Sequence, residues 1–442
     1  MPLETVPGTN LTYHLIAFDA EAEERSHPKG LESERALDTL RQEPITDVFI
    51  FSHGWLGDIP SARKQYNNWL GAMASQRDDL EKMWQARSPF RPLLIGLHWP
   101  SKPWGVEELS DSETAFKPAG IAVNALIDRY ADRIADTLKG RRALETIFAA
   151  AVSDLAPNHL PAAVRDAYRT LDEEAALGSD GEAGAPGRDR EPFDPEAIFQ
   201  ASEMVAALTA GFRLDGLLAP LRTLSFWKMK DRARQVGETG GFQLLCRLQQ
   251  AADPGVKFHL MGHSFGCIVA SGTVAGAEAG PPPVHPVDSL VLVQGALSLW
   301  SYCAEIPVAP GRSGYYHRLI RDHRVSGPTV TTRSRYDIAT GKFYPIGAGI
   351  RGQVDLAPGE FPKYGALGTF GVRGPGIEIV DRPMLPSDRP YAFEPGKVYN
   401  LEASEFISPT ADSQDAHSNI YQKPEVAHAV WEAALGSPPS QI

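Results

Sequence analysis

The fold is decided by the stretch KFHLMGHSFGCIVASG, residues 257–272. Its first part, Lys257–Met261, is a candidate strand, and Cys267–Gly272 continues as a helix of small residues. Between them stands Gly262-His263-Ser264-Phe265-Gly266. Alone, these five residues are compatible with a glycine-rich turn. Between a strand and a helix they predict a sharp, strained turn that lifts Ser264 above a sheet, with glycines where side chains would collide.

Short apolar and β-branched runs alternate with helical patterns along the chain, which is typical of a mostly parallel sheet covered by helices. Two of the runs, Val48–Phe51 and Leu290–Val293, are continuously apolar, as expected for strands buried on both faces. We therefore predict an α/β fold with a doubly wound, mostly parallel sheet. The predicted strands are Tyr13–Phe18, Asp47–Ser52, Pro92–His98, Lys257–Gly262, Ser289–Gln294, Pro328–Arg333 and Lys397–Glu402.

Apolar residues at helical spacing predict a core-facing helix over Ala62–Ala86 and a last helix over Pro424–Leu435. The interval Lys102–Gly237 is too long for a simple crossover, and it contains helical patterns at 121–138, 143–152 and 197–208. We predict that residues 1–101 and 237–442 form the core and that 102–236 form an inserted helical cap.

Two segments of unusual composition lie inside these predicted domains. The polar stretch 171–195 is rich in Gly, Asp and Glu, which predicts a flexible loop within the cap. The segment 341–395 is rich in Gly and Pro, which predicts an insert of loops and short hairpins within the core.

Composition narrows the classes of partner. The chain has 442 residues and a formal net charge of -12, which argues against nucleic acid as its main partner. No stretch approaches the roughly 20 apolar residues that span a bilayer, and the first residues lack the pattern of a secretory signal. Three cysteines without metal-ligand or redox spacing fit a reduced compartment, so we expect a cytoplasmic protein.

A second turn with chemical potential follows the strand Asp47–Ser52. The sequence there is His53-Gly54-Trp55, and glycine lets the backbone approach a bound group closely. Such a turn can offer a backbone N–H to a developing oxyanion, beside the N–H of Phe265. We predict Trp55 as the donor, with Gly54 as the alternative, and interpret the His53 ring as a brace for the turn, less favoured as a general base.

An acid and a base follow Ser264 at the ends of later predicted strands. Asp337 ends the run that begins at Pro328, where a carboxylate can accept an imidazole N–H and fix its tautomer. Asp at a strand end is often a simple turn former, so Glu305 remains the alternative acid. His417 lies in a polar loop after the last predicted strand and is the best-placed base. His428 falls inside a predicted helix, and His317 and His323 precede the acid strand.

The order Ser264, Asp337, His417, with an upstream His-Gly turn, resembles the α/β-hydrolase superfamily. The resemblance covers roughly Val48–Trp99, Gly241–Tyr336 and Lys397–Leu435. It implies a Ser-His-Asp mechanism on a doubly wound sheet, with the catalytic groups on loops at its carboxyl edge. It also implies hydrolysis through a covalent acyl-enzyme, with no metal and no organic cofactor.

The substrate class stays open between related reactions. The segment Phe212–Gln235 has an apolar stripe followed by basic residues, which fits a lipase lid at a membrane surface but is more often a packed cap helix. Pro220 interrupts the pattern and predicts two short helices. The leading hypothesis is a carboxylic-ester hydrolase, an esterase or lipase acting on a small or lipid-like acyl ester. The alternatives are a serine peptidase or amidase, and a non-catalytic binding protein of the same fold.

Overall fold

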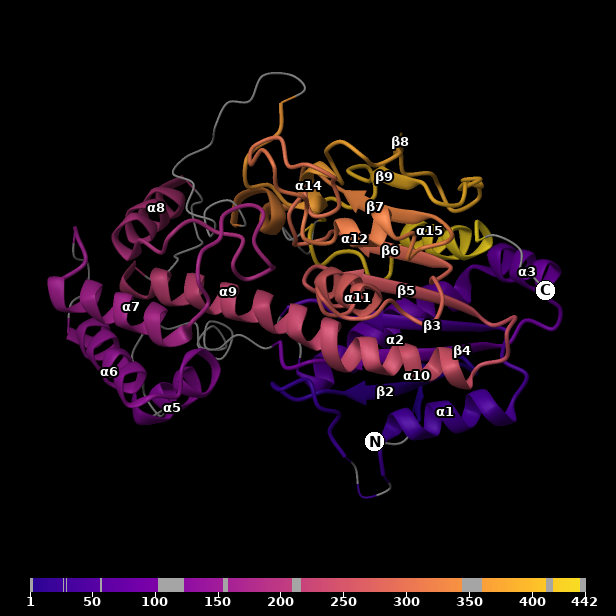
Figure 1. Cartoon of the computed structure of the whole chain (residues 1–442), viewed down its shortest axis with the longest axis horizontal. Coiled ribbons are helices and arrows are strands. Elements are labelled where there is room, and N and C mark those ends of the chain that lie inside the picture. The colour runs from indigo at the N-terminus through magenta and orange to yellow at the C-terminus, as the bar shows by residue number, and fades with distance from the viewer. Residues whose placement is uncertain are drawn as a thin grey trace. The chain divides into compact units, whose positions relative to one another are not determined.

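Figure 1 shows the computed structural model, which describes residues 3–26, 28, 30–55, 58–101, 123–153, 158–208, 216–343, 360–410 and 416–437. The chain divides into two compact units. The first comprises Met1–Ser101, Arg232–Tyr344 and Phe361–Ile442, and the second comprises Lys102–Asp231 and Pro345–Glu360. The predicted core range 237–442 differs from this division in two ways. The second segment of the first unit begins at Arg232, and Pro345–Glu360 belongs to the second unit.

The first unit is built on a mostly parallel sheet, which has nine strands among the described residues, in the order β1-β2-β4-β3-β5-β6-β7-β9-β8. Only β1 and β2 pair antiparallel; all other neighbours are parallel. The strands are β1 Glu4–Thr5, β2 Thr12–Ala17, β3 Asp47–Ser52, β4 Pro92–His98, β5 Lys257–His263, β6 Ser289–Val293, β7 Thr329–Arg333, β8 Ile379–Pro383 and β9 Val398–Glu402. The α/β class is therefore confirmed.

All seven predicted strands are present, each within one residue of its predicted ends. The central strands β3 and β5 are buried along their whole length, which explains the continuous apolar run Val48–Phe51 of β3. Their register pairs Ser52 with Gly262, so the chain leaves both strands at the same level. The turns that begin at His53 and His263 therefore lie side by side at the carboxyl edge.

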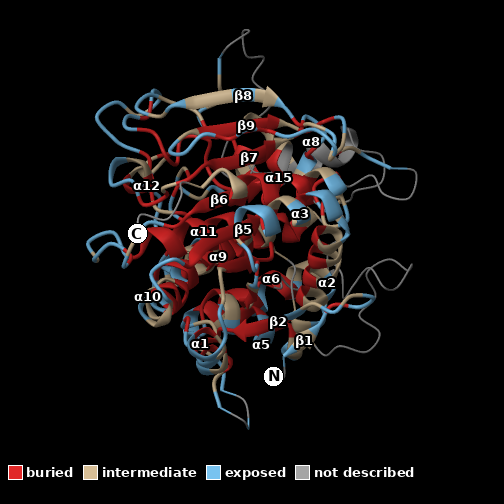
Figure 2. Ribbon diagram, turned by 90° about the vertical axis from the view of Figure 1, so that its right-hand side faces the viewer, coloured by how far each residue is buried: buried red, intermediate tan, exposed pale blue. Residues whose placement is uncertain are grey.

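Helices cover both faces of the sheet, as Figure 2 shows. One face carries α1 Glu32–Gln42, α10 Phe242–Ala251, α11 Gly266–Ala275 and α12 His317–Arg321. The other carries α2 Ile59–Ser75, α3 Arg77–Ala86 and α15 Pro424–Leu435. Two short π-helices, η2 Gly237–Gly241 and η3 Ala339–Phe343, and a one-turn helix, α14 Leu367–Phe370, complete the first unit among the described residues.

The predicted single helix Ala62–Ala86 is two helices, α2 and α3. The backbone leaves the helical region at Gln76, with φ -80° and ψ 77°, and the second helix restarts with Asp78 and Asp79 in its first turn, where negative side chains favour a helix start. The apolar spacing continues across the break, because both helices turn the same side toward the core. The predicted last helix, Pro424–Leu435, is confirmed as α15.

The segment 341–395 contains more regular structure than predicted. Its described residues supply β8, which pairs parallel with β9 at the edge of the sheet, and the one-turn helix α14. These residues form no hairpin, and the part of the prediction that falls on 344–359 lies outside the described residues. β8 has no apolar run that predicts it, since this edge strand is only half-buried and reads IVDRP.

The second unit is helical among its described residues. Its helices are α5 Val123–Ile134, α6 Leu138–Ser153, α7 Ala162–Ala175, α8 Pro195–Leu208, η1 Gly216–Leu218 and the greater part of α9 Ala219–Val236. A boundary lies where Pro220 predicts one, because η1 ends at Leu218 and α9 begins at Ala219. Pro220 stands in the first turn of α9, where its missing N–H costs nothing, so the segment after it is one long helix and not a short one.

Residues 171–195, predicted as a polar flexible loop, begin as the last turn of α7 and continue as a loop with buried charges. The guanidinium of Arg190 donates to Asp172 over 2.6 Å, and the buried ammonium of Lys230 binds the buried Asp189. The flexibility of this loop stays a prediction. Among the described residues, no helix has the length and apolar character needed to cross a membrane.

Candidate active site

Ser264 occupies the sharp turn that the sequence predicts, between β5 and α11. Its φ is +56°, in the left-handed region that L-residues other than Asn and Asp rarely adopt. The turn is held because the Ser264 N–H donates to the Val293 carbonyl over 3.1 Å. A Cβ at Gly262 would collide with the backbone of Gly266, and a Cβ at Gly266 with the carbonyl of Ser52. Both glycines are therefore required by space.

Ser264, His417 and Asp337 form one continuous hydrogen-bonded chain, called here the carboxyl-edge chain. The Nε2 of His417 lies 2.8 Å from the Oγ of Ser264, and its Nδ1 lies 2.8 Å from the Oδ2 of Asp337. Because a carboxylate only accepts, Nδ1 carries the proton and Nε2 of the neutral ring accepts from the Ser hydroxyl. The three residues follow β5, β9 and β7, so three parallel strands deliver them to the same edge.

The carboxylate of Asp337 is buried, and neutral donors hold it in place. Its Oδ2 also accepts from the Gln294 amide over 2.7 Å, and its Oδ1 accepts from the Thr340 backbone N–H over 2.9 Å. Burial alone would raise the pKa of Asp337, but the charge and hydrogen bond of His417 and these two donors lower that pKa below its usual value. Asp337 is thus held ionised and aimed at His417.

The His-Gly turn lies directly against Ser264. A Cβ at Gly54 would stand 2.8 Å from the Cβ of Ser264, so only glycine leaves this approach open. The ring of Trp55 lies 5.7 Å from the ring of Phe265, which precedes the first residue of α11. The three predicted oxyanion donors therefore surround the Ser264 turn, and their roles stay predictions.

The ring of His53 is fully buried and engaged away from Ser264. Its Nδ1 lies 2.8 Å from the Gly54 carbonyl, so it must donate, and its Nε2 then accepts from Nδ1 of His98 over 3.0 Å. Burial lowers the pKa of His53 to about 4, so the ring is neutral at ordinary pH. These contacts fit the predicted brace, since both ring nitrogens have partners outside the carboxyl-edge chain.

Several residues of this region carried no signal in the sequence. Gln294, at the end of β6 with φ +47°, binds Asp337, and Tyr66 of α2 accepts the His53 backbone N–H over 2.9 Å. His263 contacts both His417 and Tyr421. A polar residue at the end of a buried strand is the one cue that could have drawn attention to Gln294 and His263.

The alternative residues lie elsewhere. Glu305 is exposed and accepts the Gly311 N–H over 3.1 Å, so it is not beside His417. His317 bonds the Tyr302 carbonyl over 3.0 Å, and His323 is exposed with φ +49°. His428 is buried in α15 with Asp79 as its partner at 2.7 Å.

Asp79, His428 and Glu432 form the one group of metal-ligating side chains found among the described residues, with ligand atoms within 4.8 Å of one another. The Nζ of Lys82 already lies 3.1 Å from Asp79 and 2.8 Å from Glu432. Nε2 of His428 must donate to the Arg389 carbonyl at 2.9 Å, so a proton also lies between Nδ1 and Asp79. Two cations thus balance the two carboxylates without a metal.

Comparison with protein-family models, curated proteins and solved structures gives no match for this chain.

Proposed function

We propose that the protein is a serine hydrolase of the α/β-hydrolase type, with Ser264, His417 and Asp337 as its catalytic triad and a carboxylic ester as its substrate. One observation carries the proposal: the carboxyl-edge chain runs unbroken from a strained Ser through His to a buried Asp. The strand order and the helices on both faces support the fold assignment, since each group follows a parallel strand at its carboxyl end.

In the proposed mechanism His417 removes the Ser264 proton while the Oγ attacks the acyl carbonyl. The tetrahedral intermediate collapses as His417 protonates the leaving alcohol, which leaves an acyl-enzyme. Water then attacks the acyl-enzyme, gives its proton to His417, and releases the acid as the proton returns to Ser264. Asp337 stabilises the imidazolium in both halves.

The oxyanion is assigned to the backbone N–H groups of Phe265 and Trp55. The His53 ring binds the carbonyl of the Gly54–Trp55 peptide, and in a trans peptide the N–H points the opposite way. The Trp55 N–H is therefore directed away from the His53 ring, which favours Trp55 over Gly54 as the donor. The N-terminus of α11 adds a favourable field.

Burial of the apolar stripe in α9 argues for a packed helix over a membrane-binding lid. Leu217, Leu221, Leu224 and Trp227 are buried, and Lys230 is buried with Asp189. Leu214 lies outside the described residues. An esterase of small or moderately sized acyl groups therefore ranks above a lipase that needs a lipid surface. A peptidase or amidase uses the same groups and ranks next, and a binding protein without activity ranks last, because the triad geometry is intact.

A fluorophosphonate probe tests the nucleophile, and a substrate panel tests the reaction. We expect the probe to label the wild type and leave Ser264→Ala unlabelled. p-Nitrophenyl esters of increasing acyl length, compared with peptide p-nitroanilides, separate ester from amide cleavage. Equal labelling of both proteins, or no labelling of the wild type, overturns the assignment of Ser264; faster turnover of the anilides replaces the esterase with a peptidase.

A further inference from the structure

The histidine that directly precedes Ser264 makes contacts that the proposed mechanism does not use. His263 ends β5 and is 2% exposed. Its Nε2 lies 2.9 Å from the backbone carbonyl of His417, and its Nδ1 lies 2.6 Å from the hydroxyl of Tyr421. A carbonyl can only accept, so Nε2 carries the proton. Nδ1 of the neutral ring must then accept from Tyr421.

This ring keeps one tautomer across the pH range in which a serine hydrolase works. Burial, and next the positive charge of protonated His417, lower the pKa of His263 to about 3. The ring is therefore neutral when His417 takes up its proton. A neutral neighbour does not oppose the imidazolium, although the two ring centroids are only 4.8 Å apart.

His417 needs an anchor because it lies on a long connection. β9 ends at Glu402 and α15 begins at Pro424, and His417 lies between them in the described part 416–423, outside any helix or strand. Holding one side chain of such a loop in a single geometry costs conformational entropy. His263 binds the backbone of His417 itself and the side chain of Tyr421 four residues later, so it closes a clamp over 417–421.

The clamp is fixed at both of its ends. The ring of Tyr421 packs edge-on against Trp69 of α2 at 5.6 Å, which holds the hydroxyl in position. On the other side, a Cβ at Gly54 would stand 3.1 Å from Nδ1 of His263, so the His-Gly turn packs against the same ring. His263 thus contacts the base loop and the oxyanion turn while it adjoins Ser264 in the chain.

We propose that His263, oriented by Tyr421, is the positioning residue that holds the His417 loop in register with Ser264 and the oxyanion turn. The catalytic part of this proposal rests on the proposed function; the structural part does not. The two parts are therefore measured separately.

Hydrogen exchange of the peptide 416–423 measures the clamp without any reference to activity. His263→Phe keeps a ring of similar shape but removes both nitrogens, and Tyr421→Phe removes only the hydroxyl. We expect both variants to exchange faster at 416–423, with the larger change in His263→Phe, while α15 at 424–435 keeps its wild-type protection and serves as the internal control. Unchanged exchange at 416–423 in His263→Phe overturns the proposal, whatever the enzyme does.

Steady-state kinetics on the best p-nitrophenyl ester then measures positioning. We expect His263→Phe to lower kcat about 100-fold with KM nearly unchanged, as for a misplaced catalytic group. Tyr421→Phe loses one hydrogen bond, and we expect about a fivefold loss. His263→Gln can still donate from Nε2 and should recover about tenfold of the lost rate. The double variant His263→Phe/His417→Ala should be no slower than His417→Ala, because positioning of residue 417 cannot affect the rate once its imidazole is absent.

Additive losses in that double variant, or no recovery with Gln, overturn the positioning role. The wild type could fail to hydrolyse the esters and to react with the fluorophosphonate, while exchange at 416–423 still rises in His263→Phe. In that case the proposed function is wrong, and so is the catalytic part of this proposal. That result upholds the clamp as a structural device.

Discussion

The first unit contains two hydrogen-bonded chains of Ser, His and Asp, and only one of them is suited to chemistry. The second, called here the amino-end chain, joins Ser289, His259 and Asp47 near the amino ends of their strands. The Oγ of Ser289 lies 2.8 Å from Nδ1 of His259, whose Nε2 lies 3.1 Å from Oδ1 of Asp47. By residue type and distance it is nearly indistinguishable from the carboxyl-edge chain.

The two serines differ in their backbone. Ser289 is a regular residue of β6, paired in register with His259 of β5, and it is 1% exposed. No turn presents its hydroxyl, because the residue lies within the regular strand. Ser264 has φ +56° and stands directly before the N-terminal end of α11, where the helix dipole favours a developing negative charge.

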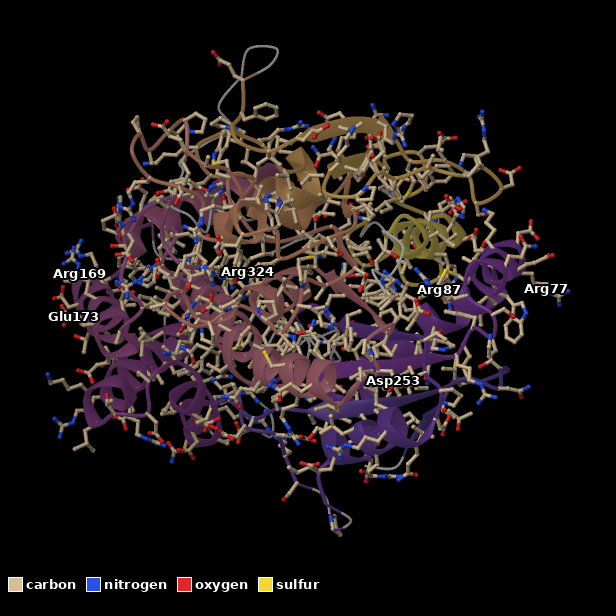
Figure 3. The ribbon with its side chains drawn as sticks, turned by 45° about the vertical axis from the view of Figure 1, so that its right-hand side comes forward. Arg77, Arg87, Arg169, Glu173, Asp253 and Arg324 are labelled. Atoms are coloured by element: carbon tan, nitrogen blue, oxygen red, sulfur yellow. The ribbon has the colours of Figure 1, made fainter. Side chains whose placement is uncertain are left out.

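The two aspartates differ in their partners. Asp47 is bound by the guanidinium of Arg87 at 2.8 Å, which also donates to the Ala434 carbonyl at the end of α15. Figure 3 shows Arg87 beside that helix. Asp337 has only neutral partners besides His417. The charge of Asp47 therefore joins β3 to α15, whereas the charge of Asp337 is left for the imidazolium. The two hydrogen-bonded chains share the Ser-His-Asp composition, and their neighbours are what favours the carboxyl-edge chain as the catalytic one in the proposed function.

Replacing the two serines should give the largest difference in kcat between the two hydrogen-bonded chains. We expect Ser264→Ala to lower kcat about 10⁵- to 10⁶-fold, since the covalent route is lost. Ser289→Ala should keep kcat within about twofold and cost about 1 kcal/mol of unfolding free energy for one hydrogen bond. Ester turnover and urea unfolding of both variants measure this. A large loss of kcat in folded Ser289→Ala would contradict the assignment.

Replacing the two aspartates gives the next largest effect. In Asp337→Asn the amide no longer fixes the tautomer or stabilises imidazolium, and we expect a loss of about 10⁴-fold in kcat at unchanged stability within about 1 kcal/mol. Asp47→Asn should keep kcat. It should cost about 2 to 3 kcal/mol of unfolding free energy, less than a fully buried pair because Arg87 is partly exposed. The opposite pattern would exchange the roles of the two chains.

Closing the approach to Ser264 should have a smaller but still large effect. In Gly54→Ala the new methyl group would stand 2.8 Å from the Cβ of Ser264, so the oxyanion turn must shift. We expect a loss of about 100- to 1000-fold in kcat, as for the loss of one oxyanion donor. Gly71→Ala, in α2 with only Val6 at 4.0 Å, is the matched control and should keep kcat and gain about 0.5 to 1 kcal/mol of stability. A near-normal rate in Gly54→Ala would place the oxyanion elsewhere.

The sequence predicts the carboxyl-edge chain because its members are marked locally. Ser264 is flanked by glycines at a strand end, and Asp337 and His417 follow later strands in a known order. The amino-end chain has no such mark. It exists because the register places Asp47 beside Lys257 and His259 beside Ser289, and register depends on the whole sheet.

The contacts around the site were beyond prediction for the same reason. Gln294 reaches Asp337, and His263 reaches His417, only because separate loops converge at one edge. The edge strand β8 was missed because a half-buried, charged strand lacks the apolar run that marks its neighbours. Local chemistry could be predicted, whereas long-range pairing could not.

Two buried histidines, His428 of α15 and His263 at the end of β5, should respond oppositely to pH, which is the smallest effect expected. Burial alone would lower the pKa of His428, but its hydrogen bonds to Asp79 and to the Arg389 carbonyl raise that pKa above its usual value. Its stabilisation is therefore complete below the unfolded pKa of about 6.5 and is lost as pH rises through the folded pKa, by at most about 1.4 kcal/mol per pH unit. The pKa of His263, lowered to about 3, gives stability that is lost as pH falls below about 6.5.

Urea unfolding of the wild type and of His428→Gln between about pH 5 and 9 separates these two contributions. We expect the wild type to lose stability in both directions. In His428→Gln the fall in stability above about pH 6.5 should disappear. The fall toward acid pH should remain, because the histidines at the carboxyl edge are intact. An unchanged alkaline slope in His428→Gln would mean that His428 is neutral in the folded protein. The proton between His428 and Asp79 would then reside on the Asp79 carboxyl group. The cluster of Asp79, His428 and Glu432 would contain one positive charge fewer than its hydrogen bonds indicate.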